Sequence, residues 1–244
     1  MPHQGQEGVL IDSAGNRLLA TLFLAPGDEP KPTALLLHGL PGIEKNYDLA
    51  TGLRESGWNA LLFHYRGCWG SGGDYSLLTL TQDAAAALDL LLGGSHPQVD
   101  VGRLAMIGHS MGGYAALRSG TDERVRAVAT YGPVTAPARL PFTDPERASY
   151  LTSFLHGISP ETFIREWNRL PDVFEAASSI PPKPLLVVHG EGDEVVPVEQ
   201  SRLLEKRLGS SADFAYHPDA NHAFTWHRPW LRDKVLGWLM ERGL

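Results

Sequence analysis

The sequence contains a single cysteine, Cys68, among its 244 residues. One cysteine cannot form an intramolecular disulfide, and its isolation favours a reducing compartment. No apolar run approaches the roughly 18 residues of a membrane span, because Asp89 interrupts the richest stretch, Ala84 to Leu92. The first residues lack the charged and apolar regions of a signal peptide. We therefore expect a cytoplasmic protein without a membrane segment.

A basic excess is also missing. The chain carries 21 Lys and Arg against 28 Asp and Glu, a net charge of −7, which argues against nucleic acid as a partner. No HExxH or similar spacing indicates a metal site, and the chemistry considered below needs no cofactor. Four histidines follow or end predicted strands, and we expect them to be hydrogen-bonded side chains rather than metal ligands: His38, His64, His109 and His189.

Short apolar runs alternate with helical patterns along most of the chain. A turn at residues 13–16 separates the first two runs and predicts a β-hairpin. Continuous apolar strands alternating with helices indicate a mostly parallel sheet with helices on both faces, in one α/β domain over residues 1–244. The predicted strands are Val9–Asp12, Leu18–Leu24, Thr33–Leu37, Asn59–His64, Leu104–Ile107, Val125–Tyr131, Pro184–Val188 and Asp213–Tyr216.

One segment breaks this rhythm. About 50 residues separate the Val125 strand from the Pro184 strand, more than a simple crossover needs. Pro145 and Pro160 stand where first helical turns would begin, and amphipathic spacing follows each. We therefore predict a small helical insertion over residues 135–181, placed as a lid at the carboxyl edge of the sheet.

The most informative motif is Gly108-His109-Ser110-Met111-Gly112, which lies between an apolar strand and a helix. In that context the pattern is typical of a nucleophile elbow, a tight turn that exposes a serine hydroxyl. Small flanking residues are required because the backbone there is strained and crowded. Ser110 is therefore the candidate nucleophile.

A serine nucleophile needs a base and an acid that orients it. His222 lies in a loop after the last short strand, and Asp193 follows the Pro184 strand directly. All three residues follow strands of a parallel sheet, whose carboxyl ends share one edge. Other acids stand nearby in the sequence: Glu191, Glu194 and Asp219.

These residues resemble those of α/β-hydrolases over nearly the whole chain. The order Ser110, Asp193, His222 is the order of that fold, and His38-Gly39-Leu40-Pro41-Gly42 is similar to its oxyanion loop. The resemblance implies that the N–H groups of Leu40 and Met111 form the oxyanion hole. The loop at residues 64–73 resembles that of serine esterases and of catalytic domains related to prolyl oligopeptidase.

The resemblance implies a serine carboxylesterase that acts on small to medium acyl esters, including aryl esters, through an acyl-enzyme on Ser110. A small serine peptidase and an acyltransferase remain alternatives, although the chain is short for an added gating domain. A non-catalytic binding protein is a further alternative, because fold alone does not fix function. The expected partner is a small ester, and the sequence does not specify an oligomeric state.

Aromatic side chains are the candidates for substrate contact. Trp69, Phe154 and Trp167 are proposed to line an acyl pocket, although the last two could equally form the core of the insertion. Cys68 is a rival nucleophile in a glycine-rich loop, but a small packing residue is the favoured interpretation.

Overall fold

The computed structural model describes residues 5–44 and 46–243. Its centre is an eight-stranded sheet in the order β1-β2-β4-β3-β5-β6-β7-β8. The first two strands form the predicted antiparallel hairpin, and β2 also runs antiparallel to β4, whereas all later neighbours are parallel. The strands are β1 Gly5–Ser13, β2 Asn16–Leu24, β3 Lys31–Leu37, β4 Asn59–Phe63, β5 Val99–His109, β6 Val125–Tyr131, β7 Leu185–Gly190 and β8 Asp213–His217.

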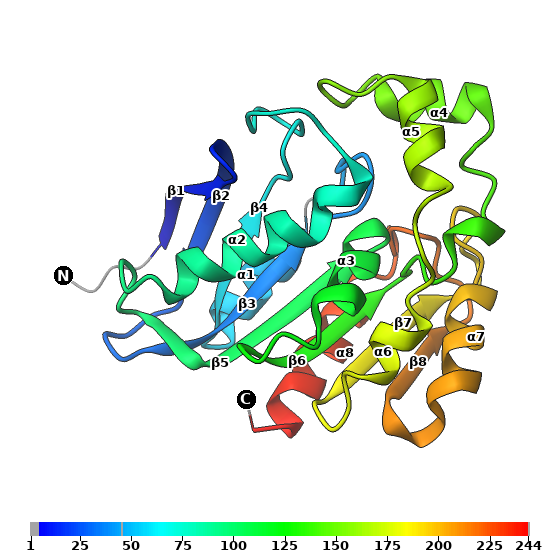
Figure 1. Ribbon diagram of the computed structural model, residues 1–244. Coiled ribbons are helices and arrows are strands. Elements are labelled where there is room, and N and C mark those ends of the chain that lie inside the picture. The colour runs from blue at the N-terminus through cyan, green and yellow to red at the C-terminus, as the bar shows by residue number, and fades with distance from the viewer. Residues whose placement is uncertain (1–4, 45, 244) are drawn as a thin grey trace.

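Alternating side chains of the central strands enter two separate hydrophobic clusters. On β3, Leu35 and Leu37 face one cluster, while Ala34 and Leu36 face the other. Helices α1 (Tyr47–Glu55) and α8 (Arg228–Glu241) cover one face. The opposite face is covered by α2 (Leu80–Leu92), α3 (Met111–Ser119), α6 (Phe174–Ser178) and α7 (Glu199–Leu208). The predicted sheet with helices on both faces is therefore confirmed (Figure 1).

None of the helices in residues 5–44 and 46–243 combines the length and the apolar character needed to cross a membrane.

The insertion lies beyond the carboxyl edge of the sheet, at the upper right of Figure 1. The helices there are α4 (Pro145–Thr152) and α5 (Pro160–Trp167), after a short 3₁₀ turn at Pro137–Arg139, whereas α6 lies back on the face of the sheet. Each of the first two helices has proline in its first turn, as predicted from sequence, and an N-cap side chain that accepts a hydrogen bond. The capping residues are Asp144 and Ser159.

Backbone and side-chain hydrogen bonds tie the insertion to the loop that follows β4. The N–H of His156 donates to the Gly67 carbonyl at 2.8 Å, and the His156 carbonyl accepts from Tyr75 at 2.9 Å. Glu166 on α5 accepts from the Ser76 hydroxyl and from the Leu77 N–H, both at 2.9 Å. The insertion is therefore held at two separate points by the segment that follows β4.

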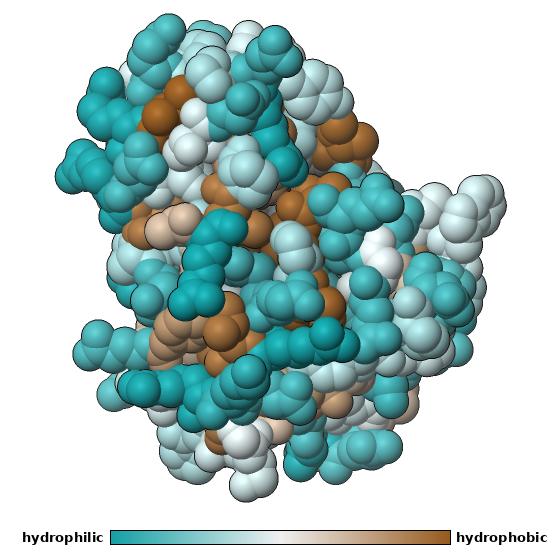
Figure 2. Space-filling model, turned by 90° about the vertical axis from the view of Figure 1, so that its right-hand side faces the viewer, coloured by the Kyte–Doolittle hydropathy of each residue, from teal (hydrophilic) through white to brown (hydrophobic). Residues whose placement is uncertain are grey.

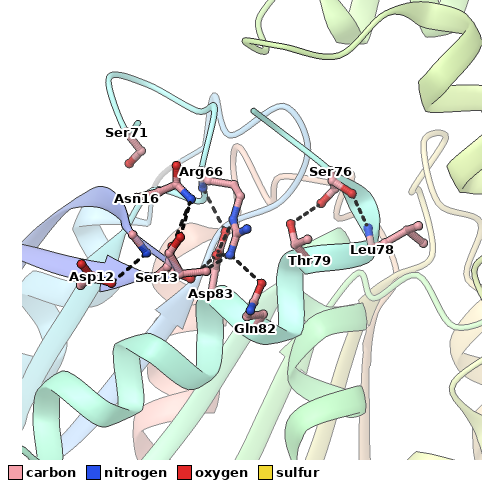
Figure 3. A network of polar contacts seen from close by, with 12 residues as sticks. Asp12, Ser13, Asn16, Arg66, Ser71, Ser76, Leu78, Thr79, Gln82 and Asp83 are labelled. Carbon is pink, nitrogen blue, oxygen red and sulfur yellow. Dashed lines mark hydrogen bonds and ion pairs between the residues drawn. The ribbon is translucent and has the colours of Figure 1, made fainter. Parts of the chain in front are cut away.

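A buried ion pair anchors the loop after β4 to helix α2 (Figure 3). The Arg66 guanidinium donates to the Asp83 carboxylate at 2.6 and 2.9 Å, and the Arg66 N–H donates to it at 3.0 Å. The Ser13 hydroxyl on β1 also donates to Asp83, at 2.7 Å. The Asp83 side chain is almost completely buried, so its charge depends on these four donors.

Replacing Asp83 by asparagine is expected to lower the free energy of unfolding by about 3–5 kcal/mol, because it leaves the buried Arg66 guanidinium without its counter-charge. Urea denaturation followed by circular dichroism measures the change. Asp89→Asn on the same helix is the matched control, since its exposed pair with Arg124 should contribute less than about 1 kcal/mol. Equal losses in the two variants would contradict the anchoring role.

Candidate active site

Ser110 occupies a strained turn between β5 and α3. Its backbone dihedrals are φ 56° and ψ −117°, a conformation that non-glycine residues rarely adopt. The flanking glycines make the turn possible. A Cβ on Gly108 would lie 2.2 Å from the Gly112 carbonyl oxygen, and one on Gly112 would lie 2.0 Å from the Leu37 carbonyl oxygen. The strained conformation therefore requires the two glycines of the motif.

Asp193 and His222 form a hydrogen-bonded pair, although 29 residues separate them in sequence. The Nδ1 atom of His222 lies 2.7 Å from Oδ2 of Asp193. The Asp193 side chain is fully buried, whereas that of His222 is 15% exposed. Because Nδ1 is engaged by the carboxylate, the Nε2 atom of His222 is the ring nitrogen available to another group.

Backbone N–H groups bind the second carboxylate oxygen of Asp193. Oδ1 of Asp193 accepts from the N–H groups of Val195 and Val196, at 2.9 and 2.8 Å. Burial acts to raise the pKa of Asp193, but the hydrogen bonds from His189 and His222, together with that from Val196, hold it well below its usual range. Asp193 is therefore ionised at any pH at which the protein would work.

Two further buried histidines support this arrangement. The Nδ1 atom of His189 lies 2.6 Å from the Ser201 hydroxyl, and its Nε2 lies 2.8 Å from the Val196 carbonyl and 3.3 Å from the Asp193 carboxylate. Both neighbours of Nε2 are acceptors, so this nitrogen carries the proton. The ring of His109 lies with its Nε2 3.0 Å from the His222 carbonyl, and burial lowers its pKa well below the usual value.

The serine turn and the Asp–His pair lie against two adjacent residues at the end of β6. The Ser110 N–H donates to the Tyr131 carbonyl at 3.1 Å. A Cβ on the next residue, Gly132, would lie 3.2 Å from Nδ1 of His222 and 3.3 Å from Oδ2 of Asp193. The structure thus gathers the three residues singled out from sequence at one edge of the sheet.

Two backbone N–H groups stand beside Ser110. Met111 is the first residue of α3, where the helix offers no internal acceptor. Leu40 follows Gly39, whose added Cβ would lie 2.9 Å from Cβ of Ser110. Within the described residues neither N–H donates to another backbone group.

The rival residues lie in other environments. Glu191 pairs with Arg202 at 2.6 Å, and Glu194 and Asp219 are exposed, so Asp193 is the acid that contacts the imidazole. Cys68 is buried, and burial together with the nearby Asp83 charge raises the pKa of its thiol well above the usual value. A thiol held protonated in this way is a poor nucleophile.

A pocket of about 400 Å³ opens between the oxyanion loop and the insertion. Apolar surface gathers in the hollow between the insertion, at the top of Figure 2, and the body of the molecule. The pocket is lined by both His109 and His222 together with Gly39, Leu40, Pro41, Gly42, Ile43, Glu44, Arg147, Tyr150, Leu151, Val195 and Ala223.

The three aromatic residues expected to line an acyl pocket lie elsewhere among the described residues. Trp167 is 1% exposed and belongs to the core of the insertion, where its indole N–H donates to the Pro137 carbonyl at 3.0 Å. Phe154 packs edge-on against Tyr150, and only the latter reaches the pocket. Trp69 donates to the Pro41 carbonyl at 2.8 Å and so supports the oxyanion loop from outside the pocket. Amphipathic spacing alone did not distinguish pocket from core.

Residues 53–241, most of the chain, match the model of the prolyl oligopeptidase family. The chain belongs to this family. Its eight-stranded, mostly parallel sheet has the arrangement of an α/β-hydrolase fold. Among curated proteins, it is 28% identical over 201 residues to the uncharacterized protein YfhR of Escherichia coli O157:H7. That match covers 81% of this chain and 65% of YfhR, so the chain spans slightly less than two thirds of this relative.

Two further comparisons involve esterases. Esterase LipC of Mycobacterium tuberculosis is 36% identical over 120 residues, which cover 45% of this chain and 28% of LipC. The structure of Est1E from Butyrivibrio proteoclasticus with bound ferulic acid superposes with a TM-score of 0.76. It is 23% identical and the match covers 96% of this chain and 98% of Est1E. At this identity the likeness establishes the fold.

Proposed function

We propose that the protein is a serine carboxylesterase that hydrolyses small to medium acyl esters. The observation that carries the proposal is the buried Asp193–His222 hydrogen bond of 2.7 Å beside the strained Ser110 turn. An ionised acid that holds Nδ1 of an imidazole leaves Nε2 as a base for a neighbouring hydroxyl. The esterases LipC and Est1E among the similar proteins support an ester as substrate.

In the proposed first half-reaction, Ser110 Oγ attacks the ester carbonyl carbon while its proton passes to Nε2 of His222. The carbonyl oxygen becomes an anion, which the N–H groups of Leu40 and Met111 stabilise. Asp193 holds the imidazole in position and stabilises its charged form. When the tetrahedral intermediate collapses, the C–O bond to the alcohol breaks, and the leaving oxygen takes the proton from Nε2.

The second half-reaction repeats these steps with water. The imidazole accepts a proton from water as the water oxygen attacks the acyl carbon of the Ser110 ester. The same two N–H groups stabilise the second oxyanion. Collapse releases the carboxylic acid, and the proton returns from Nε2 to Ser110 Oγ. The cycle consumes one ester and one water and leaves the protein unchanged.

A series of p-nitrophenyl esters from acetate to decanoate tests the substrate range. We expect kcat/KM to rise by about fourfold for each added CH₂, the transfer free energy of a methylene, until the acyl chain fills the pocket. Beyond that length kcat/KM should fall, because the pocket has a volume of only about 400 Å³. Absorbance at 405 nm, corrected for spontaneous hydrolysis, provides the rates.

Matched p-nitroanilides form the second arm of this experiment, because the family also takes its name from a peptidase. The proposal predicts that each anilide is cleaved far more slowly than the ester of the same acyl group. Anilide rates equal to or above the ester rates would replace the esterase with a small peptidase. Ester turnover that appears only with an added alcohol acceptor would instead indicate an acyltransferase.

A further inference from the structure

Arg147 lies in the wall of the pocket, on the first turn of α4. The N-cap Asp144 accepts a hydrogen bond from the Arg147 N–H at 3.0 Å, which fixes the start of this helix. Tyr150 and Leu151, about one turn further along α4, line the same pocket. On the opposite wall, His222 and the oxyanion loop complete the cavity. Arg147 therefore faces the space in which a substrate of Ser110 would be held.

Among the described residues the guanidinium of Arg147 forms no close ion pair, and the charge of Asp144 acts on it only at longer range. Its central carbon lies 3.8 Å from the centre of the Phe142 ring, so one face of the cation rests on an aromatic surface. No carboxylate lies within 4.0 Å of it, and its five N–H donors make no hydrogen bond within residues 5–44 and 46–243. Arg147 is half-buried, and this burial lowers the pKa of its guanidinium.

The rest of the pocket does not supply the missing partner. Most of its lining is apolar, and Glu44 is the acid among its lining residues. The Glu44 carboxylate accepts the Asn46 N–H at 2.7 Å and forms no ion pair with Arg147. A partly desolvated cation with unused donors in an otherwise apolar pocket favours an anion of matching geometry. A carboxylate fits, since the guanidinium fork can bind both of its oxygens.

We propose that Arg147 recognises a carboxylate on the substrate, so that the preferred esters carry a free acid group as well as the scissile ester. This inference rests on the proposed esterase function and narrows its substrate class. Arg147 then acts as a specificity-determining residue, because it binds a part of the substrate that does not react. Binding by a remote group of this kind raises kcat/KM for esters that carry it.

Two matched substrate pairs test the proposal and distinguish the side on which the acid lies. Monoethyl adipate against ethyl hexanoate places the carboxylate on the acyl side, and 4-carboxyphenyl butyrate against phenyl butyrate places it on the alcohol side. In the wild type, kcat/KM for the acid-bearing member of one pair should exceed that of the neutral member by about 10- to 100-fold. Comparison of the kcat/KM ratios of the two pairs shows whether the acyl side or the alcohol side of the ester lies at Arg147.

Arg147→Met keeps much of the aliphatic stem and removes the charge. In this variant kcat/KM for the acid-bearing ester should fall to that of its neutral counterpart, so that the ratio of the two approaches one. Arg147→Lys should retain part of the preference, because it keeps the charge without the planar fork. Arg169→Met is the matched control on the exposed surface of the insertion and should leave the ratio unchanged.

A readout without turnover separates this inference from the esterase proposal. Adipate and 4-hydroxybenzoate should slow fluorophosphonate labelling of the wild type but not of Arg147→Met. If esters are cleaved and neither the ratios nor the protection depend on Arg147, carboxylate recognition is wrong and the esterase proposal stands. If no ester is cleaved while Arg147-dependent protection persists, the reaction is wrong and carboxylate binding stands. If neither ester turnover nor Arg147-dependent protection is observed, both the esterase proposal and carboxylate recognition are wrong.

Discussion

Ser110→Ala is expected to lower kcat for p-nitrophenyl butyrate by about 10⁶-fold, with KM changed little. The variant lacks the atom that forms the acyl-enzyme, so only the oxyanion donors and binding remain to assist attack by water. The loss of one hydroxyl from a side chain that is 4% exposed should leave the fold intact. Initial rates at saturating ester, on protein freed of wild-type traces, measure the change.

A second serine provides the control for that experiment. Ser149 lies exposed on α4, close to the pocket-lining Tyr150, and belongs to no part of the proposed mechanism. Ser149→Ala should therefore keep kcat within about twofold of wild type. Both variants should show wild-type circular dichroism. If Ser110→Ala retained more than about one hundredth of the wild-type kcat, Ser110 would not be the nucleophile.

Asp193→Asn is expected to lower kcat by about 10⁴-fold. The asparagine amide is nearly isosteric with the carboxylate but cannot stabilise the charged imidazole, and it favours the wrong tautomer of His222. The Val195 and Val196 N–H groups already occupy one oxygen, so the amide nitrogen would be directed towards Nδ1 of His222. Steady-state kinetics on p-nitrophenyl butyrate between pH 5 and 9 measure the effect.

The pH profile adds a separate check on the acid. Because hydrogen bonds hold the pKa of Asp193 well below its usual range, its carboxylate is ionised throughout that interval. The acid limb of the wild-type profile should therefore report a group other than Asp193. Asp219→Asn, which alters an exposed acid in the loop that carries His222, should leave kcat and the profile unchanged. A loss of less than tenfold in Asp193→Asn would exclude Asp193 as the orienting acid.

Ser110 could be predicted from sequence because the residues that shape its turn are adjacent to it. Gly108 and Gly112 are needed on steric grounds within a span of five residues, and the strand and helix on either side have clear patterns. Asp193 and His222 are distant in sequence, but both follow strands whose carboxyl ends share one edge. Topology therefore placed both near this edge once the parallel sheet had been inferred, and the resemblance to α/β-hydrolases favoured Asp193 over the neighbouring acids.

The pocket could not be predicted in the same way, because it depends on how the insertion packs. Trp167 and Tyr150 both lie on amphipathic helices, yet the indole enters the core of the insertion and the phenol reaches the pocket. Helical spacing reports that a side chain is buried, not what it is buried against. No local pattern marks Arg147 as lacking a counter-ion, since that property depends on residues far away in the sequence.

The exact ends of helices and strands were also difficult to predict from the sequence. β5 begins at Val99, five residues before the predicted apolar run, because the buried Val99 pairs with Lys31 of β3 ahead of a register shift. α4 begins at Pro145, as its proline predicted, and Asp144 caps the helix there. The five-residue helix α6 was not predicted, because a segment this short has little periodicity.

The central claim is that Ser110 is an activated nucleophile held beside the Asp193–His222 pair. Mass spectrometry of the wild type after incubation with a fluorophosphonate tests it most directly, with the modified peptide sequenced. We expect one stoichiometric adduct on Ser110, formed at least about a hundredfold more slowly in His222→Ala because the hydroxyl loses its base. No adduct, or an adduct on another residue such as Cys68, would contradict it.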